Sequence, residues 1–192
     1  MTRFPIKTSI RLFLALAVVY TGAAGADNYR SVQADSQLQF ISRFEGEEAP
    51  GEFKRFDVEV QTDPETAGPG AILVLVDVTS ATMGSPDLDA GMAEPEWFDF
   101  ASIPQAKFQS ERIEAKSESE FLVTGFLQLK GVRQPVSLSI RWLSQSSSAT
   151  LSGTAELSRL SFGIGSGEWS DTTSIEDKVV VRFSISLAKT GR

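Results

Sequence analysis

The 192 residues of this chain include neither histidine nor cysteine, two residue types that carry out much of enzyme chemistry. Their absence excludes disulfide bonds, His- or Cys-ligated zinc, attached c-type haem, and catalysis by Ser-His-Asp or Cys-His groups. Ser102, Ser110 and Ser161 therefore have no histidine that would activate them as nucleophiles. We predict that the protein has no catalytic residues and is not an enzyme.

Two carboxylate clusters and one glycine-rich segment have residue types that occur in ligand sites. Paired carboxylates, here within 45–48 and at Asp87 and Asp89, transfer protons or hold hard cations in other proteins. Asp87-Leu88-Asp89 lacks the further oxygen ligands of an EF-hand loop, and 163–167 lacks the Gly-Lys-Ser/Thr ending of a phosphate-binding loop. We predict a solvated acidic surface, a flexible strand connection at 163–167, and no metal site.

Aromatic side chains, mainly phenylalanine, are abundant in this sequence. Eleven of the thirteen phenylalanines and all three tryptophans lie after residue 26. Such rings either fill the core of a β-fold or line an elongated apolar pocket, and the pattern leaves both readings open. The segment 94–100 sets Trp97, Phe98 and Phe100 among three carboxylates, outside the regular strands. It is either a lid over a pocket mouth or a plug that seals one end of the fold.

The elements that position these rings are strands, because apolar and polar residues alternate with a period of two. Alternation or apolar runs of strand length cover eight segments, 35–45, 52–62, 71–78, 106–114, 119–129, 134–143, 148–157 and 179–187. We place a tight turn at 131–135, and 87–92 and 94–100 each have the composition of a short helix.

Short connections predict antiparallel pairing, and a sheet of eight strands removes its exposed edges by closing on itself. We predict an all-β fold, an eight-stranded antiparallel lipocalin-like barrel with a short helical excursion around 87–100; a two-sheet sandwich is the alternative. A barrel of this size is either filled by its own side chains or holds one slender ligand.

The first 26 residues have the organisation of a secretory signal peptide. Three basic residues precede a nine-residue apolar run at 12–20, and Ala24-Gly25-Ala26 offers a cleavage site. This run is shorter than the about 20 residues that span a bilayer. We predict cleavage near Asp27, a bacterial periplasmic location, and one domain over 27–192, with an uncleaved anchor as the alternative. Removal of 1–26 changes the net charge from −7 to −10, which disfavours nucleic acid and anionic lipid headgroups.

Short motifs follow one another in a fixed order between Tyr29 and Leu187. They are Ser36-x-Leu38-x-Phe40, Gly51-x-Phe53, Asp77-x-Thr79-Ser80, Trp97-Phe98, Ile103-Pro104-x-Ala106-x-Phe108-x-Ser110, Gly125-x-Leu127, Gly131-Val132-x-x-Pro135-Val136, Arg159-x-x-Phe162-Gly163-Ile164-Gly165 and Asp177-x-Val179. In number, order and spacing they resemble the YceI-like family of periplasmic, lipocalin-like polyisoprenoid-binding proteins. This chain departs from the family at Phe44, where many members carry a histidine, and this makes the expected pocket mouth more apolar.

The resemblance implies a barrel around a long apolar channel that holds an isoprenoid chain, either of a polyprenyl lipid or of a quinone tail, with no cofactor besides this ligand. It favours pocket lining as the role of the rings, and we predict the ligand contacts from it. The lining candidates are Phe40, Phe53, Phe56, Phe108 and Phe126, the gate is Trp97, Phe98 and Phe100, and Arg159 meets a diphosphate or quinone head or else makes a surface salt bridge.

The expected partners are an isoprenoid lipid or quinone and, transiently, a membrane or a membrane protein, but not nucleic acid. Two other functions remain as alternatives. One is the binding of another amphiphile, such as a fatty acid or its amide. The other is a structural or interaction protein whose barrel is filled by its own side chains.

Overall fold

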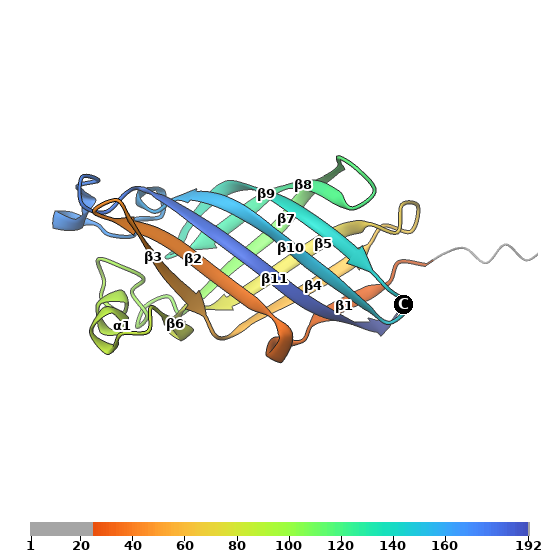
Figure 1. Cartoon of the computed structure of the whole chain (residues 1–192), viewed down its shortest axis with the longest axis horizontal. Coiled ribbons are helices and arrows are strands. Elements are labelled where there is room, and N and C mark those ends of the chain that lie inside the picture. Colours follow the sequence, from red (N-terminus) through yellow and green to blue (C-terminus); the bar gives the residue numbers. More distant parts are fainter. Residues whose placement is uncertain (1–24, 192) are drawn as a thin grey trace, which may run out of the picture.

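Eleven β-strands and one short α-helix make up the computed structural model, which describes residues 25–191 (Figure 1). The predicted signal segment 1–26 therefore lies almost entirely outside the described residues. The elements are β1 (Asn28–Ser31), β2 (Gln37–Phe44), β3 (Glu47–Phe53), β4 (Phe56–Thr62), β5 (Pro69–Asp77), β6 (Ala81–Thr82), α1 (Pro86–Met92), β7 (Gln105–Ala115), β8 (Glu120–Leu129), β9 (Val132–Ser144), β10 (Ser148–Ser158) and β11 (Lys178–Gly191). Short 3-10 helices occupy Gln33–Asp35, Val78–Ser80, Leu160–Phe162 and Gly167–Ser170.

Eight of the strands close into a ring in the order β1-β4-β5-β7-β8-β9-β10-β11, and β11 pairs back with β1. Every pairing in the ring is antiparallel, and four of the eight pairings join consecutive strands through short hairpin connections, namely β4–β5, β7–β8, β8–β9 and β9–β10. The predicted eight-stranded antiparallel barrel is confirmed, and the sandwich alternative is wrong.

The remaining strands form a flap that extends one end of the barrel. The long strand β11 pairs with β1 along 187–191 and with β2 along 180–184, and β2 continues through β3 to β6. The predicted strand 35–45 is therefore β2, outside the closed ring. The ring position belongs to β1, whose four residues are too few to show a periodic pattern.

The predicted strand 52–62 is divided between β3 and β4 by a short interruption. There the Lys54 amide donates to Ser80 O at 3.2 Å, and the Arg55 amide donates to Ser80 Oγ at 2.9 Å. The carboxylate of Asp77 completes this junction, since it accepts hydrogen bonds from the Thr79 amide at 3.0 Å and from Arg55 Nε at 2.8 Å. The hydrogen bond from the Thr79 hydroxyl has the largest effect on the pKa of Asp77 and, together with the Arg55 guanidinium, holds it below its usual range.

Two local expectations about turns and helices are corrected by the structure. The hairpin turn between β8 and β9 is Lys130-Gly131 rather than 131–135, with φ values of 49° and 75° that suit a two-residue turn between twisted strands. The helical excursion consists of α1 alone. Residues 94–100 form successive turns, in which the Phe100 amide donates to Ala93 O at 3.2 Å and Asp99 has a φ of 51° that no α-helix accommodates.

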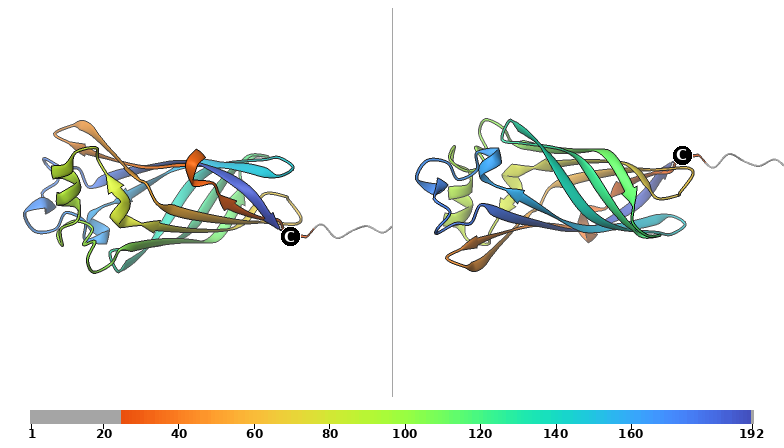
Figure 2. Two further views of the ribbon diagram at one scale, coloured as in Figure 1. Left: turned by 90° about the horizontal axis from the view of Figure 1, so that it is seen from below. Right: turned by 90° about the horizontal axis from the view of Figure 1, so that it is seen from above.

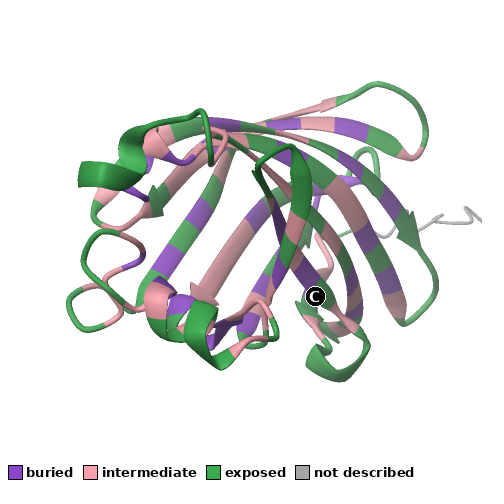
Figure 3. Cartoon of the chain, turned by 60° about the vertical axis from the view of Figure 1, so that its left-hand side comes forward, coloured by how far each residue is buried: buried purple, intermediate pink, exposed green. Residues whose placement is uncertain are grey.

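The ends of the barrel differ in what covers them. Helix α1, residues 93–104 and residues 159–177 gather at one end, and β1 and the C-terminal end of β11 lie at the other (Figures 1 and 2). We call the first the mouth end. Buried and exposed residues alternate along the strands, so that one face of each strand forms the barrel interior (Figure 3).

Candidate functional site

An apolar cavity of 140 Å³ lies inside the barrel and is lined by twenty side chains, all of them hydrocarbon. We call this cavity the chamber. Its lining comes from β2, β3, β4, β5 and β7 to β11, and along most of these strands the lining residues are two apart. The alternation predicted from the sequence therefore builds the chamber wall directly. With no polar side chain in its lining, the chamber suits a hydrocarbon group and provides no hydrogen bond to a ligand.

Three of the five predicted lining rings, those of Phe53, Phe56 and Phe108, line the chamber. Phe40 lies beside it, with its ring centroid 5.2 Å from that of Phe53, but it is not part of the lining. The sequence analysis missed Phe183, which lies in the clean alternation of β11 and lines the chamber together with aliphatic side chains.

The prediction that Phe126 lines the channel is wrong, because its ring lies on the outer wall of the barrel. Gly125 and Leu127 face inward on either side of it, and the guanidinium carbon of Arg133 stands 3.3 Å from the Phe126 ring centroid. Both faces of this part of β8 carry apolar side chains, so alternation alone could not decide which face is interior.

Two inward glycines give the chamber its width. A Cβ atom added to Gly153 would lie 2.9 Å from the Phe183 ring, and one added to Gly125 would lie 2.9 Å from the Phe108 ring. Each ring therefore lies against a glycine of the neighbouring strand, in the space that a side chain at that position would occupy. This places both rings close to the barrel wall, so that they line the chamber without filling it.

A cluster of aromatic rings covers the chamber at the mouth end. Phe98 is 8% exposed, and its ring centroid lies 6.2 Å from that of Phe40, 6.1 Å from that of Phe53 and 6.2 Å from that of Phe100. Trp97 packs instead against Trp169, with centroids 5.8 Å apart. The segment 94–100 thus packs at the mouth end, where Phe98 lies against Phe53, a ring of the chamber lining, without being part of the lining itself.

Arg159 holds the other covering segment rather than a ligand. Its side chain is 3% exposed, and its five N–H groups donate to the carbonyl oxygens of Ile164, Gly165, Trp169, Ile175 and Glu176 at 2.8–3.1 Å. No donor remains for a lipid headgroup, and the residue is not at the surface. Both roles proposed from the sequence are therefore wrong. Burial lowers the pKa of Arg159, and the charge of Asp177 opposes this shift.

The order of motifs that suggested a family is borne out by comparison with known proteins. A model of the YceI-like domain matches residues 29–187. The chain belongs to the YceI-like family. A UPF0312 protein of Pseudomonas putida (strain W619) is 30% identical over 186 residues, covering 90% of this chain and 95% of the relative. Protein YceI of Salmonella newport (strain SL254) is 27% identical over 143 residues, covering 72% of this chain and 74% of the relative.

Solved structures similar to this YceI-like chain have the same barrel. BcnA of Burkholderia cenocepacia is 29% identical and matches with a TM-score of 0.77, over 81% of this chain and 98% of its own. A polyisoprenoid binding domain from Saccharophagus degradans, implicated in plant cell wall breakdown, matches with a TM-score of 0.67, over 84% and 98%. At 17% identity this second likeness concerns the fold alone.

Another basic side chain at the mouth end of this YceI-like barrel was not selected in the sequence analysis. Lys130, in the β8–β9 turn, donates from Nζ to Gly163 O at 2.7 Å and so ties the turn to the 159–177 segment. Burial lowers the pKa of Lys130, whereas the carboxylates of Asp99 and Glu96 raise it. Its position in a turn gave no signal in the hydrophobic pattern.

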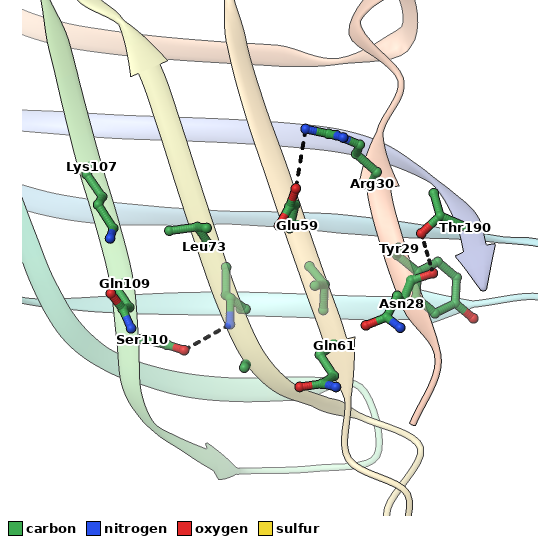
Figure 4. A pocket seen from close by; sticks show the side chains of 13 residues that line it. Asn28, Tyr29, Arg30, Glu59, Gln61, Leu73, Lys107, Gln109, Ser110 and Thr190 are labelled. Atoms are coloured by element: carbon green, nitrogen blue, oxygen red, sulfur yellow. Dashed lines mark hydrogen bonds and ion pairs between the residues drawn. The ribbon is translucent and has the colours of Figure 1, made fainter. Parts of the chain in front are cut away.

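A larger depression, of 640 Å³, lies on the outer wall across β1, β4, β5 and β7 (Figure 4). Polar side chains border it: Arg30 Nη2 pairs with Glu59 Oε1 at 3.3 Å, and Ser110 Oγ accepts a hydrogen bond from the Ile72 amide at 2.9 Å (Figure 4). This groove is open to solvent, and it is bordered by polar and charged side chains. It is therefore a poorer place than the chamber for burying an apolar ligand.

Acidic side chains and one Ser-x-x-Lys spacing are the features of this YceI-like chain that could suggest a metal centre or a nucleophile–base pair. Within residues 25–191 no three acidic side chains are placed to hold a metal ion. Ser186 and Lys189 have Ser-x-x-Lys spacing, but residues three apart on a strand point to opposite faces. Lys189 Nζ is paired with Asp27 Oδ2 at 2.7 Å. Over the same described residues, no helix is long and apolar enough to cross a bilayer.

Proposed function

We propose that this protein is a binding and carrier protein, not an enzyme, that holds the isoprenoid chain of a polyprenyl lipid or a quinone inside its chamber. The observation that carries the proposal is the all-hydrocarbon lining of an interior cavity closed by aromatic rings. Each buried CH₂ group contributes about 0.8 kcal/mol, so a hydrocarbon chain binds without a polar anchor. The name of the Saccharophagus degradans neighbour adds support for this class of ligand.

The polar head of such a ligand has to stay at the mouth end, because the chamber has no partner for it. Lys130 lies at this end, where it ties the β8–β9 turn to the 159–177 segment, and its cationic group supports a role beside an anionic or carbonyl-bearing head. We propose Lys130 for the role that Arg159 does not fill.

We further propose that the carrier works in the periplasm and touches a membrane briefly to exchange its ligand. The location rests on the signal-like organisation of 1–26. The membrane contact rests on three large hydrophobic side chains at the mouth end, Phe44, Leu88 and Trp169, which are 48%, 51% and 41% exposed. Tryptophan in particular favours the boundary between lipid headgroups and hydrocarbon.

The test is mass spectrometry of an organic extract from natively purified protein, compared between two matched variants. Ala155→Phe adds a ring to the chamber wall, whereas Thr154→Phe adds the same ring to the outer wall one residue away. We expect one isoprenoid or quinone per protein in the wild type and in Thr154→Phe, and at least about tenfold less in Ala155→Phe. Circular dichroism of both variants verifies that they fold.

Other results of this experiment would lead to other functions. A fatty acid or fatty amide in the extract would keep the chamber as the site and change the ligand class. An empty extract, together with no binding of added isoprenoid, would refute the carrier proposal and favour a barrel with a purely structural or interaction role.

A further inference from the structure

The chamber ends halfway along the barrel. On β9, Val136, Leu138 and Ile140 line it, but the next inward residue, Trp142, does not. On β11, in the same way, Val181, Phe183 and Ile185 line the chamber, but the next inward residue, Leu187, does not. The cavity therefore occupies only the half of the barrel next to the mouth, and a ligand that enters from the mouth meets a barrier at mid-depth.

Large side chains pack that barrier, which we call the floor. It consists of Tyr29, Val60, Phe121, Val123, Trp142 and Leu187, all of them 7% exposed or less. The rings of Tyr29 and Trp142 meet edge to face with their centroids 5.4 Å apart. Phe121 lies against the β4–β5 turn, since a Cβ atom on Gly68 would be 2.9 Å from its ring. The floor is thus continuous with the packed end of the barrel.

The chamber above the floor is small for a lipid. An engineered protein cavity of about 150 Å³ holds one benzene molecule, which has six carbons. At 140 Å³ the chamber therefore holds about one five-carbon isoprene unit. Phe98 packs against the lining ring of Phe53 with a phenyl ring of similar size, and displacement of Phe98 together with a shift of Phe53 would free room for about one unit more.

We propose that the floor sets a limit on the length of isoprenoid that the barrel buries, at about two isoprene units, and that any longer chain leaves its remainder outside the mouth. This inference rests on the proposed function and specifies the ligand class: short prenyl groups, or one end of a longer prenyl chain. Its physical basis is that each CH₂ adds affinity, about fourfold, only while it leaves water.

The experiment measures binding of prenol, geraniol, farnesol and geranylgeraniol, with one to four isoprene units, by competition against an apolar fluorescent probe. Each alcohol is kept below the concentration at which it aggregates. For the wild type we expect affinity to rise at least about tenfold from one unit to two and to change less than about threefold from two units to four.

Variants of the floor locate the limit. Trp142→Leu, or Phe121→Leu as a second way to deepen the chamber, should make farnesol bind about tenfold more tightly than geraniol. Leu143→Ala, next to Trp142 but 50% exposed on the outer wall, should leave the series unchanged.

Two results would overturn the inference, and they differ from each other. A steady rise in affinity to four units in the wild type would show that the floor does not limit the chain, while the carrier proposal stands. Binding of none of the four alcohols would refute the carrier proposal and the length limit together.

Discussion

Replacement of Arg159 by methionine tests whether this side chain holds the 159–177 segment over the mouth. Methionine fills much of the same space but donates no hydrogen bond. The substitution therefore leaves five backbone carbonyl oxygens, from Ile164 to Glu176, without the donors that they have in the wild type. These oxygens converge on one point only because the segment is folded around the guanidinium.

The size of the effect follows from two opposing contributions. A hydrogen bond to a charged group contributes about 1.5–3 kcal/mol, so five of them would sum to roughly 7–15 kcal/mol. Removal of the buried charge recovers several kcal/mol of desolvation, and release of the segment lets water reach the carbonyls. We therefore expect Arg159→Met to lower the free energy of unfolding by about 3–5 kcal/mol.

Urea unfolding monitored by tryptophan fluorescence measures this loss. With a slope near 2 kcal/mol per M, the midpoint should fall by about 2 M. Amide hydrogen exchange should show that residues 160–177 lose protection before the barrel strands do. Arg133→Met is the control, because Arg133 is exposed above Phe126 and should cost less than about 1 kcal/mol. An unchanged midpoint with unchanged protection of 160–177 would refute the reasoning.

Three further predictions concern the core, the acid stability and the mouth. Phe121→Ala should cost about 3–5 kcal/mol in urea unfolding and Phe126→Ala less than about 1 kcal/mol, since one ring is in the floor and the other on the outer wall; equal losses would contradict this assignment. Because the pKa of Asp77 is lower in the folded than in the unfolded chain, its stabilisation is complete above about pH 4 and is lost as the pH falls. The urea midpoints of wild type and Asp77→Asn should therefore differ at pH 7 and converge toward pH 2, and a constant difference would count against the hydrogen bonds described. Gly51→Ala places a methyl group 2.2 Å from the nearest aromatic ring atom and should cost about 1–3 kcal/mol in the same assay, whereas Gly91→Ala, with nothing within 4 Å, should be neutral or stabilising by up to about 1 kcal/mol.

Much of the barrel could be predicted from the chain because strand alternation is a local property. Long strands such as β9 and β11 repeat the inward-outward pattern over more than ten residues, and this repetition reveals both the strand and its buried face. The four residues of β1 carry no such repetition. Its place in the ring depends on pairing with β4 and β11, which are distant in the sequence.

The candidate site could be predicted only in part. Phe53, Phe56 and Phe108 were identified as lining residues, and they do line the chamber. Phe126 was misplaced because its strand is apolar on both faces, and the choice of inner face is made by the neighbouring strands. That these rings bind a ligand remains a prediction.

Composition and local pattern alone determined that this protein lacks histidine and cysteine chemistry, that it folds mainly into strands, and that its motifs follow the order of one family. These properties depend on residue identities or on neighbours within a few positions. Only the tertiary structure decided that the chamber stops at a floor beneath Ile140, that Phe98 packs against the lining ring of Phe53, and that Arg159 is enclosed by backbone carbonyls. Each of these features depends on side chains that come together from distant segments of the chain. A cavity in particular depends on the sizes and positions of all the side chains around it, and no single segment of the sequence specifies these.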